Sequence, residues 1–321
     1  MTSGISVALA CYDGERYLPE QVASIAAQTL PPDEVVISDG GSTDGTVALA
    51  RRLASEHPRL GIRVVADGQR LGVTANFARA IAASTGEFIA LCDQDDVWHP
   101  DRLRAARAAF DEPTLLVHTD ARLVDAGGLP LGVTLFSALG IGSGELERLA
   151  SGDAFAVLIR RNLVTGATTM VRRRLVDAAL PFPPGWVHDE WLALIAAAIG
   201  RLRPLPQQLI DYRQHGSNVI GVTAPTLRYR VRRMLEPRGD RYRRLAARSV
   251  ELSARLDELD APERWRALAR RKAAFERDRA SYPVHRAGRI PAILRGLRAG
   301  SYAELSSQGD VDVLRDLLQP K

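Results

Sequence analysis

Hydrophobic and polar residues along the first hundred positions fall into blocks that predict strands and helices in turn. Short apolar runs predict buried strands at residues 5–10, 34–38, 62–66 and 88–92. Between them, apolar residues recur at helical spacing and predict helices at residues 18–28, 42–56 and 76–84. Ser42 or Thr43 is expected to cap the second helix. This alternation is typical of βαβ units, so we predict an α/β protein whose mostly parallel sheet has helices on both faces.

The pattern weakens after residue 96. A strand is predicted near residues 115–118, and residues 125–144, rich in Gly and small side chains, are predicted to be a loop with partial order. Further predicted elements are a strand-like run at 165–170, a helix at 172–179 and an apolar helix at 188–199. From about residue 226 the chain becomes Arg-rich and helical, with an apolar stripe that includes Leu252, Leu256 and Leu259.

Charge divides the chain at the same place. Residues 1–225 carry 20 Lys and Arg against 25 Asp and Glu, a net charge of −5, whereas residues 226–321 carry 23 against 13, a net charge of +10. We therefore predict two domains, 1–225 and 226–321, the second a basic helical extension. Arg-rich helices of this kind are most often solvated, and contact with an anionic membrane or a partner helix is the alternative. The sequence carries no helix-turn-helix or RRM motif, and the acidic first domain would repel phosphates, so nucleic-acid binding is not expected.

Several function classes lack their sequence signals. The chain has no Walker A motif, no G-x-G-x-x-G, no G-x-S-x-G and no Cys/His zinc spacing. Two cysteines, Cys11 and Cys92, make no disulfide framework, which favours a reduced, cytoplasmic protein. The longest apolar run, residues 191–199, is shorter than the roughly 20 residues that a membrane span needs. The first residues lead directly into a strand, so no secretory signal is expected.

Polar and acidic residues follow three of the predicted strands. They are residues 12–14, residues 39–44, and the run Asp93-Gln94-Asp95-Asp96. Because open α/β sheets bind ligands at the carboxyl ends of their strands, we expect these stretches to meet in one site. Three carboxylates within four residues repel one another unless a cation or protons are held there, and carboxylate oxygens suit Mg²⁺ or Mn²⁺. The alternative is a solvated acidic turn that precedes the helix near Pro100.

These stretches and three later ones resemble the family 2 glycosyltransferases with the GT-A fold, and most of all their rhamnosyltransferase-type branch. The resemblance covers roughly residues 4–221 and excludes the last hundred. Six motifs carry it in order: residues 7–12 (VALACY), 39–46 (DGGSTDGT), 93–98 (DQDDVW), 165–168 (TGAT), 188–191 (HDEW) and 212–218 (YRQHGSN).

The resemblance implies a nucleotide-sugar donor, a divalent cation (Mg²⁺ or Mn²⁺) and sugar transfer with inversion at the anomeric carbon. It places Ala10 and Tyr12 in the base pocket, with Tyr12 packed on the base, and gives Asp39 a hydrogen bond from the base. It assigns the carboxylates of the DQDD run jointly to the ribose and the metal. Asp93 and Asp95 are implied for donor binding, and Asp95, Asp96 and His215 for metal binding.

Asp189 matches the position of the family's general base, which takes the proton of the acceptor hydroxyl. The family often has Glu before this Asp, whereas this chain has His188, so the role of the preceding residue is open. A purely structural role remains for Asp189 as a carboxylate at a helix N-terminus, and for His215 as a loop histidine bonded to backbone.

The resemblance favours an inverting glycosyltransferase of bacterial surface polysaccharide synthesis, acting on a saccharide or lipid-linked acceptor. Rhamnose from dTDP-rhamnose is the first expectation for the donor, followed by UDP-sugars. Such an enzyme would be cytoplasmic or peripheral at the inner face of the plasma membrane, through residues 226–321. The alternative is a non-catalytic nucleotide-sugar-binding or scaffold protein of the same fold.

Overall fold

The computed structural model describes residues 4–215 and 236–320, which fall into two compact units. The first unit comprises Met1–Gly152 and Leu163–Val222, and the second comprises Asp153–Asn162 and Thr223–Lys321. The domain boundary predicted at residue 225 lies outside the described residues.

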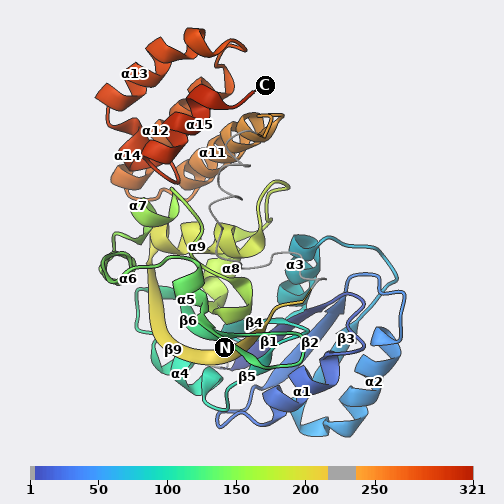
Figure 1. The fold of residues 1–321 in the computed structure, drawn as a ribbon. Helices are drawn as coiled ribbons and strands as arrows, with labels where there is room; N and C mark the ends of the chain where they lie inside the picture. Colours follow the sequence, from blue (N-terminus) through green and yellow to red (C-terminus); the bar gives the residue numbers. More distant parts are fainter. Residues whose placement is uncertain (1–3, 216–235, 321) are drawn as a thin grey trace. The chain divides into compact units, whose positions relative to one another are not determined.

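The first unit is built on one mixed sheet, shown in Figure 1. Its strands are β1 (Ile5–Cys11), β2 (Glu34–Asp39), β3 (Ile62–Val65), β4 (Phe88–Asp93), β5 (Val97–Trp98), β6 (Thr114–Val124), β7 (Pro130–Thr134), β8 (Thr169–Arg172) and β9 (Arg201–Arg213). They lie in the order β3-β2-β1-β4-β8-β6-β9-β5, with β7 paired to β6. The four strands predicted before residue 93 are parallel neighbours, whereas β8 runs antiparallel to both β4 and β6.

Helices cover both faces of the parallel part. In Figure 1, α1 and α2 lie below strands β1–β3 and α3 lies above them. The helices of this unit are α1 (Leu18–Ala26), α2 (Thr46–Glu56), η1 (Pro58–Leu60), α3 (Val73–Ala83), α4 (Arg102–Ala108), α5 (Leu135–Ala138), α6 (Ser143–Ala150), η2 (Gly166–Thr168), α8 (Arg173–Ala179) and α9 (His188–Ile199). The predicted α/β fold is confirmed. Residues 125–144 hold more regular structure than predicted, since β7 and α5 form there.

Burial explains why the strongest predictions were correct. The central strands β1 and β4 are buried along almost their whole length, as continuous apolar runs require in a sheet covered on both faces. Helix α9 is apolar around its circumference and nearly all of it is buried. The indole of Trp191 donates to the carbonyl of Ala179 at 2.8 Å, which ties α9 to the end of α8. Its N-terminus is therefore held in a fixed place.

The second unit is helical, as predicted for the C-terminal residues. Its elements are α7 (Ala154–Leu158), α11 (Arg241–Glu258), α12 (Glu263–Ala280), η3 (Arg286–Arg289), α13 (Ile290–Arg298), α14 (Ser301–Leu305) and α15 (Asp310–Leu318). At its centre Asp316 is fully buried and accepts hydrogen bonds from Arg279, Tyr242 and Tyr302 at 2.6–2.8 Å. This buried carboxylate is fully partnered, which is the condition for burying a charge at tolerable cost.

Candidate active site

The ends of three parallel strands meet at one edge of the sheet, as predicted. Ala10 near the end of β1 is paired with Ser38 of β2 on one side and with Asp93 of β4 on the other. One residue further on, Cys11 is paired with Asp39. The register therefore brings Ala10, Asp39 and Asp93 together, although 83 positions separate the first from the last in the chain.

Asp39 organises the loop between β2 and α2. Its carboxylate is buried and accepts hydrogen bonds from the N–H groups of Gly41 and Ser42, both at 3.0 Å, and from the Ser42 hydroxyl. The Ser42 hydroxyl also accepts the N–H of Asp13 at 2.9 Å. The prediction that Ser42 or Thr43 caps the helix is wrong, because α2 begins at Thr46 with Gly45 at the N-cap. The Ser42 hydroxyl instead links this loop to the loop after β1.

Tyr12 stands at the surface of this edge. Its side chain is 36% exposed, and the guanidinium of Arg70 lies over its ring at 4.9 Å from the centroid. Its backbone is fixed by the side-chain amide of Gln94, which accepts from the Tyr12 N–H and donates to the Tyr12 carbonyl, both at 2.9 Å. Gln94 and Arg70 are site residues that sequence reasoning missed. The only available signal for Gln94 was its place inside the DQDD run.

The three carboxylates after β4 have different surroundings. Asp96 is buried, and its Oδ1 accepts the N–H of Arg213 at 3.0 Å, while its Oδ2 has no hydrogen-bond partner among the described residues. Asp95 Oδ2 lies 2.8 Å from Nε2 of His215. Burial and the neighbouring charges of Asp95 and Asp189 raise the pKa of Asp93 to about 7. Burial, followed by the charges of Asp95 and Asp93, likewise raises the pKa of Asp96.

Residues at the end of β9 contact the carboxylates that follow β4. The Arg213 side chain donates to the carbonyl of Asp95 at 2.8 Å and pairs with Glu20 on α1 at 2.6 Å. The ring of Tyr17 stacks on the ring of His215, with centroids 5.0 Å apart and planes 17° apart. These contacts fix His215 beside Asp95. Residues 216–218 of the last resemblance motif lie outside the described residues.

Asp189 lies in the first turn of α9 and is buried. Its Oδ2 accepts the N–H of Gly166 at 2.9 Å, and its Oδ1 accepts the N–H of Glu190 at 2.6 Å. The charge of Asp189 contributes to the raised pKa of Asp93. The preceding His188 is buried and stacks on Phe77 with ring centroids 4.0 Å apart, and burial lowers its pKa to about 3. It is therefore a neutral packing residue beside the candidate base.

Arg102 is a second residue that the sequence did not single out. It is 2% exposed and lies over the Trp98 ring, 3.5 Å from its centroid. Its Nη2 donates to the carbonyl of Leu91 on β4 at 3.1 Å and to that of Ala167 at 2.6 Å. Since Gly166 beside Ala167 holds Asp189, the guanidinium connects the strand of the DQDD carboxylates to the turn that positions the candidate base.

Comparison with known proteins decides the family. The family model described as glycosyl transferase family 2 matches residues 6–174, just over half of the chain. The chain belongs to this family. It is 30% identical over 226 residues to an uncharacterized glycosyltransferase of Nostoc sp. (strain PCC 7120), a match that covers 67% of this chain and 66% of the relative. An uncharacterized protein of Mycobacterium bovis is 28% identical over 222 residues, which are 67% of this chain and only 60% of that protein.

Solved structures share the GT-A fold of family 2. TarS residues 1–349 of S. aureus, in complex with UDP-GlcNAc, gives a TM-score of 0.55 at 19% identity, covering 97% of this chain and 89% of that one. The mannosyltransferase PcManGT of Pyrobaculum calidifontis, in complex with GDP-Man and Mn²⁺, gives 0.54 at 21% identity, covering 97% and 83%. At these identities the likeness shows the fold.

This family 2 chain therefore gathers its predicted site residues at one edge of the sheet. Asp95 and His215 are in direct contact, whereas no group of three or more His, Cys, Asp or Glu in the described part of the chain is arranged as a metal cluster. In that same part, no helix has the length and apolarity to cross a bilayer.

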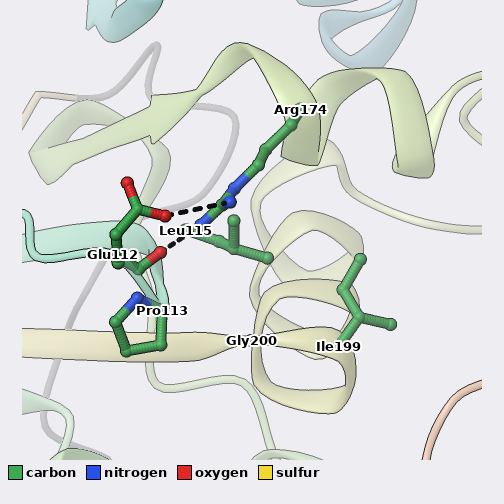
Figure 2. Close-up of a pocket in the computed structure, with 6 residues that line it drawn as sticks. All are labelled: Glu112, Pro113, Leu115, Arg174, Ile199 and Gly200. Carbon is green, nitrogen blue, oxygen red and sulfur yellow. Dashed lines mark hydrogen bonds and ion pairs between the residues drawn. The ribbon is translucent and has the colours of Figure 1, made fainter.

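A hollow in the first unit lies away from these residues. Figure 2 shows this hollow of about 490 Å³, which is lined by Glu112, Pro113, Leu115, Arg174, Ile199 and Gly200. It lies where β6 and β9 begin, and both run parallel to β4, so it is at the opposite edge of the sheet from the carboxylates. Arg174 and Glu112 form an ion pair across it at 3.6 Å. It contains none of the predicted site residues.

Proposed function

We propose that this family 2 protein transfers a sugar from a nucleotide-sugar donor to an acceptor hydroxyl, with inversion at the anomeric carbon. The observation that carries the proposal is the link through Arg102. Its guanidinium donates to Leu91, two residues before Asp93, and to Ala167, beside the Gly166 that binds Asp189, although 96 positions separate Asp93 from Asp189. A candidate general base then lies near the carboxylates that are expected to hold the donor diphosphate, as transfer from the donor to an acceptor hydroxyl requires. The donors bound by TarS and PcManGT, UDP-GlcNAc and GDP-Man, support the nucleotide-sugar class.

For the donor we propose Ala10, Tyr12, Asp39, Asp93 and Asp95. Ala10 offers no side chain beyond Cβ at the strand end, so a flat base can approach the backbone there, with the exposed Tyr12 ring available for stacking. The carboxylate of Asp39 is held rigidly by its own loop and can accept a further hydrogen bond through a free lone pair.

For a divalent cation we propose Asp95, Asp96 and His215. Two observations support this set: Asp96 Oδ2 is buried without a hydrogen-bond partner among the described residues, and Asp95 Oδ2 lies 2.8 Å from the imidazole of His215. The three side chains do not form a ready metal cluster, so binding a cation would require them to draw together. When bound, such a cation would offset negative charge on the departing diphosphate. PcManGT holds Mn²⁺ in its complex with GDP-Man, which supports Mn²⁺ or Mg²⁺ here.

Asp189 is the proposed catalytic base. An inverting transfer needs one group to take the acceptor proton while the diphosphate leaves from the opposite side, so one carboxylate is enough. The backbone N–H groups of Gly166 and Glu190 fix the positions of both oxygens of Asp189, which would hold the carboxylate in place to take the proton of the acceptor hydroxyl.

The finer assignments are also proposals. Rhamnose from dTDP-rhamnose comes first and UDP-sugars next, with a saccharide or lipid-linked acceptor of bacterial surface polysaccharide synthesis. We place the protein in the cytoplasm, with peripheral contact to anionic membrane through residues 226–321. The two-domain division, 1–225 and 226–321, belongs with these proposals. A non-catalytic nucleotide-sugar-binding protein of the same fold is the second candidate.

The test combines donor binding with turnover. A panel of nucleotide sugars is screened by thermal shift with Mn²⁺, with Mg²⁺ and with EDTA, and the stabilising donor is then used in transfer assays. We expect Asp189→Asn to lose at least 1,000-fold in turnover while its donor-dependent thermal shift stays within a degree of wild type, a loss consistent with removal of a general base. Asp177→Asn, at an exposed position on α8, is the matched control. Wild-type turnover in Asp189→Asn would refute the base assignment, and donor binding without any turnover in the wild type would favour the non-catalytic candidate.

A further inference from the structure

Helix α13 presents an apolar side to solvent. Ile290, Leu294 and Leu297 recur at i, i+4 and i+7, so they lie on one side of the helix, and they are 44%, 44% and 41% exposed. Ile293, by contrast, is 5% exposed and packs into the second unit. The helix is thus apolar both toward its own unit and away from it. We call the side formed by Ile290, Leu294 and Leu297, together with the exposed Arg286, Arg295 and Arg298, the α13 surface.

The charge around this helix has one sign. Residues 279–303 contain five arginines and no Asp or Glu. Two of them are used inside the unit, since Arg279 binds Asp316 and Arg289 donates to the carbonyls of Asp316 and Gln319. The other three, Arg286, Arg295 and Arg298, are exposed and form no ion pair with any described residue.

Three other exposed arginines of the same unit are paired with acids. Arg244 pairs with Asp240 at 2.8 Å, Arg270 with Asp257 at 3.0 Å, and Arg271 with Glu304. Arg243, Arg264 and Arg277 are also exposed and form no ion pair with a described residue, so unpaired arginines are not confined to α13. What sets the α13 surface apart is that its unpaired arginines lie beside exposed aliphatic side chains, in a stretch that contains no Asp or Glu.

We propose that the α13 surface is a docking surface for an anionic lipid bilayer. A helix that lies in the membrane interface needs aliphatic side chains to enter the acyl boundary and basic side chains at its flanks to meet anionic headgroups, and α13 has both. A nucleic acid would use the arginines but leave the aliphatic stripe in water, and the surface offers no aromatic ring for base stacking. This inference rests on the peripheral membrane contact proposed above and names the surface that makes it, and because it concerns binding alone it can fail without affecting the proposed glycosyl transfer.

The test is vesicle flotation of the full chain. Vesicles of phosphatidylcholine alone are compared with vesicles that contain 30% phosphatidylglycerol by composition, at low and at high salt. We expect flotation only with the anionic vesicles, and less of it at high salt because ions screen surface charge. Flotation equal on both vesicle types, or none on either, would overturn the proposal.

Variants locate the binding. Since each arginine near an anionic surface changes partitioning roughly fivefold, Arg295→Gln with Arg298→Gln should reduce binding on the order of 25-fold. Leu294→Gln with Leu297→Gln should also reduce it. The matched controls are Arg51→Gln with Arg52→Gln, exposed on α2, and Val250→Gln, 45% exposed on α11. Arg295 and Arg298 form no ion pair with a described residue, so their replacement should not prevent folding. Unchanged binding in this variant would refute the assignment even if the leucine variant failed to fold.

Discussion

The contact between Gly166 and His188 offers a test of how Asp189 is held. A Cβ added at Gly166 would lie 2.7 Å from His188 Nε2, 3.5 Å from its Cε1 and 3.6 Å from Asp189 Cβ. The first separation is far below the roughly 3.5 Å of an optimal non-bonded contact, so Gly166→Ala forces either the His188 ring or the Gly166 backbone to move. His188 cannot withdraw easily, because its ring is buried against Phe77, which is itself 1% exposed.

Two effects set the expected size of the change. Overpacking a filled interior costs about 1–3 kcal/mol, so the free energy of unfolding should fall by that amount. Movement of the Gly166 backbone also weakens its 2.9 Å hydrogen bond to Asp189, and a displacement of about 1 Å at a catalytic group can reduce the rate by about 100-fold. We therefore expect Gly166→Ala to lower kcat by one to two orders of magnitude, with a smaller change in donor binding.

The assay measures nucleotide release together with urea unfolding. Gly144→Ala on α6 is the control, because no atom lies within 4 Å of the added Cβ. The double variant Gly166→Ala with His188→Ala removes the ring that blocks the new methyl group, so part of the loss in kcat should return, with a coupling energy of about 1–3 kcal/mol. Full activity in Gly166→Ala, or independent effects in the double variant, would refute the reasoning.

Two further predictions follow from buried side chains. Arg102→Met leaves the carbonyls of Leu91 and Ala167 without their donor, so the free energy of unfolding measured in urea should fall by about 2–6 kcal/mol, and a wild-type value would contradict the contacts described. His118 is buried without a hydrogen-bond partner in the described chain, and burial lowers its pKa to about 3, below the unfolded value of about 6.5. The unfolded state then takes up a proton as pH falls through 6.5 while the folded state does not, so His118 contributes stability above pH 6.5 that is lost on acidification, about 2 kcal/mol between pH 7 and pH 5. His118→Leu should show a correspondingly smaller loss over this interval in urea titrations, and an equal loss would remove His118 as the cause.

The sequence was sufficient for elements that local pattern determines. The strand predicted at residues 5–10 is Ile5–Cys11, and the helix predicted at 188–199 is His188–Ile199. Both are uninterrupted apolar segments bounded by polar residues. The residues that are buried in the fold are therefore the ones that the local pattern marks as apolar. The meeting of the strand ends was also predictable, because parallel strands place their carboxyl ends at one edge.

Features that depend on distant segments were not predictable. Nothing near Arg102 indicates that its guanidinium reaches both Leu91 and Ala167, since the second contact spans 65 positions. The segment Asp153–Asn162 belongs to the second unit, where Phe155 packs against Trp265 with ring centroids 5.3 Å apart, although its neighbours in sequence belong to the first. Ser42 is a residue type that often caps helices, but its hydroxyl oxygen accepts the N–H of Asp13, 29 positions earlier, while its proton is donated to Asp39.

The main chain holds three carboxylates of the site in place. Asp39, Asp96 and Asp189 each accept at least one backbone N–H, so the main chain itself holds their charges in place. Such bonds stabilise the charged form without adding a side chain that could fill the space around the carboxylate. Backbone bonds do not remove the repulsion, because burial and the neighbouring carboxylates raise the pKa of Asp96, which accepts the Arg213 N–H, as well as that of Asp93. A positively charged group beside Asp93 and Asp96 would therefore relieve the repulsion that remains.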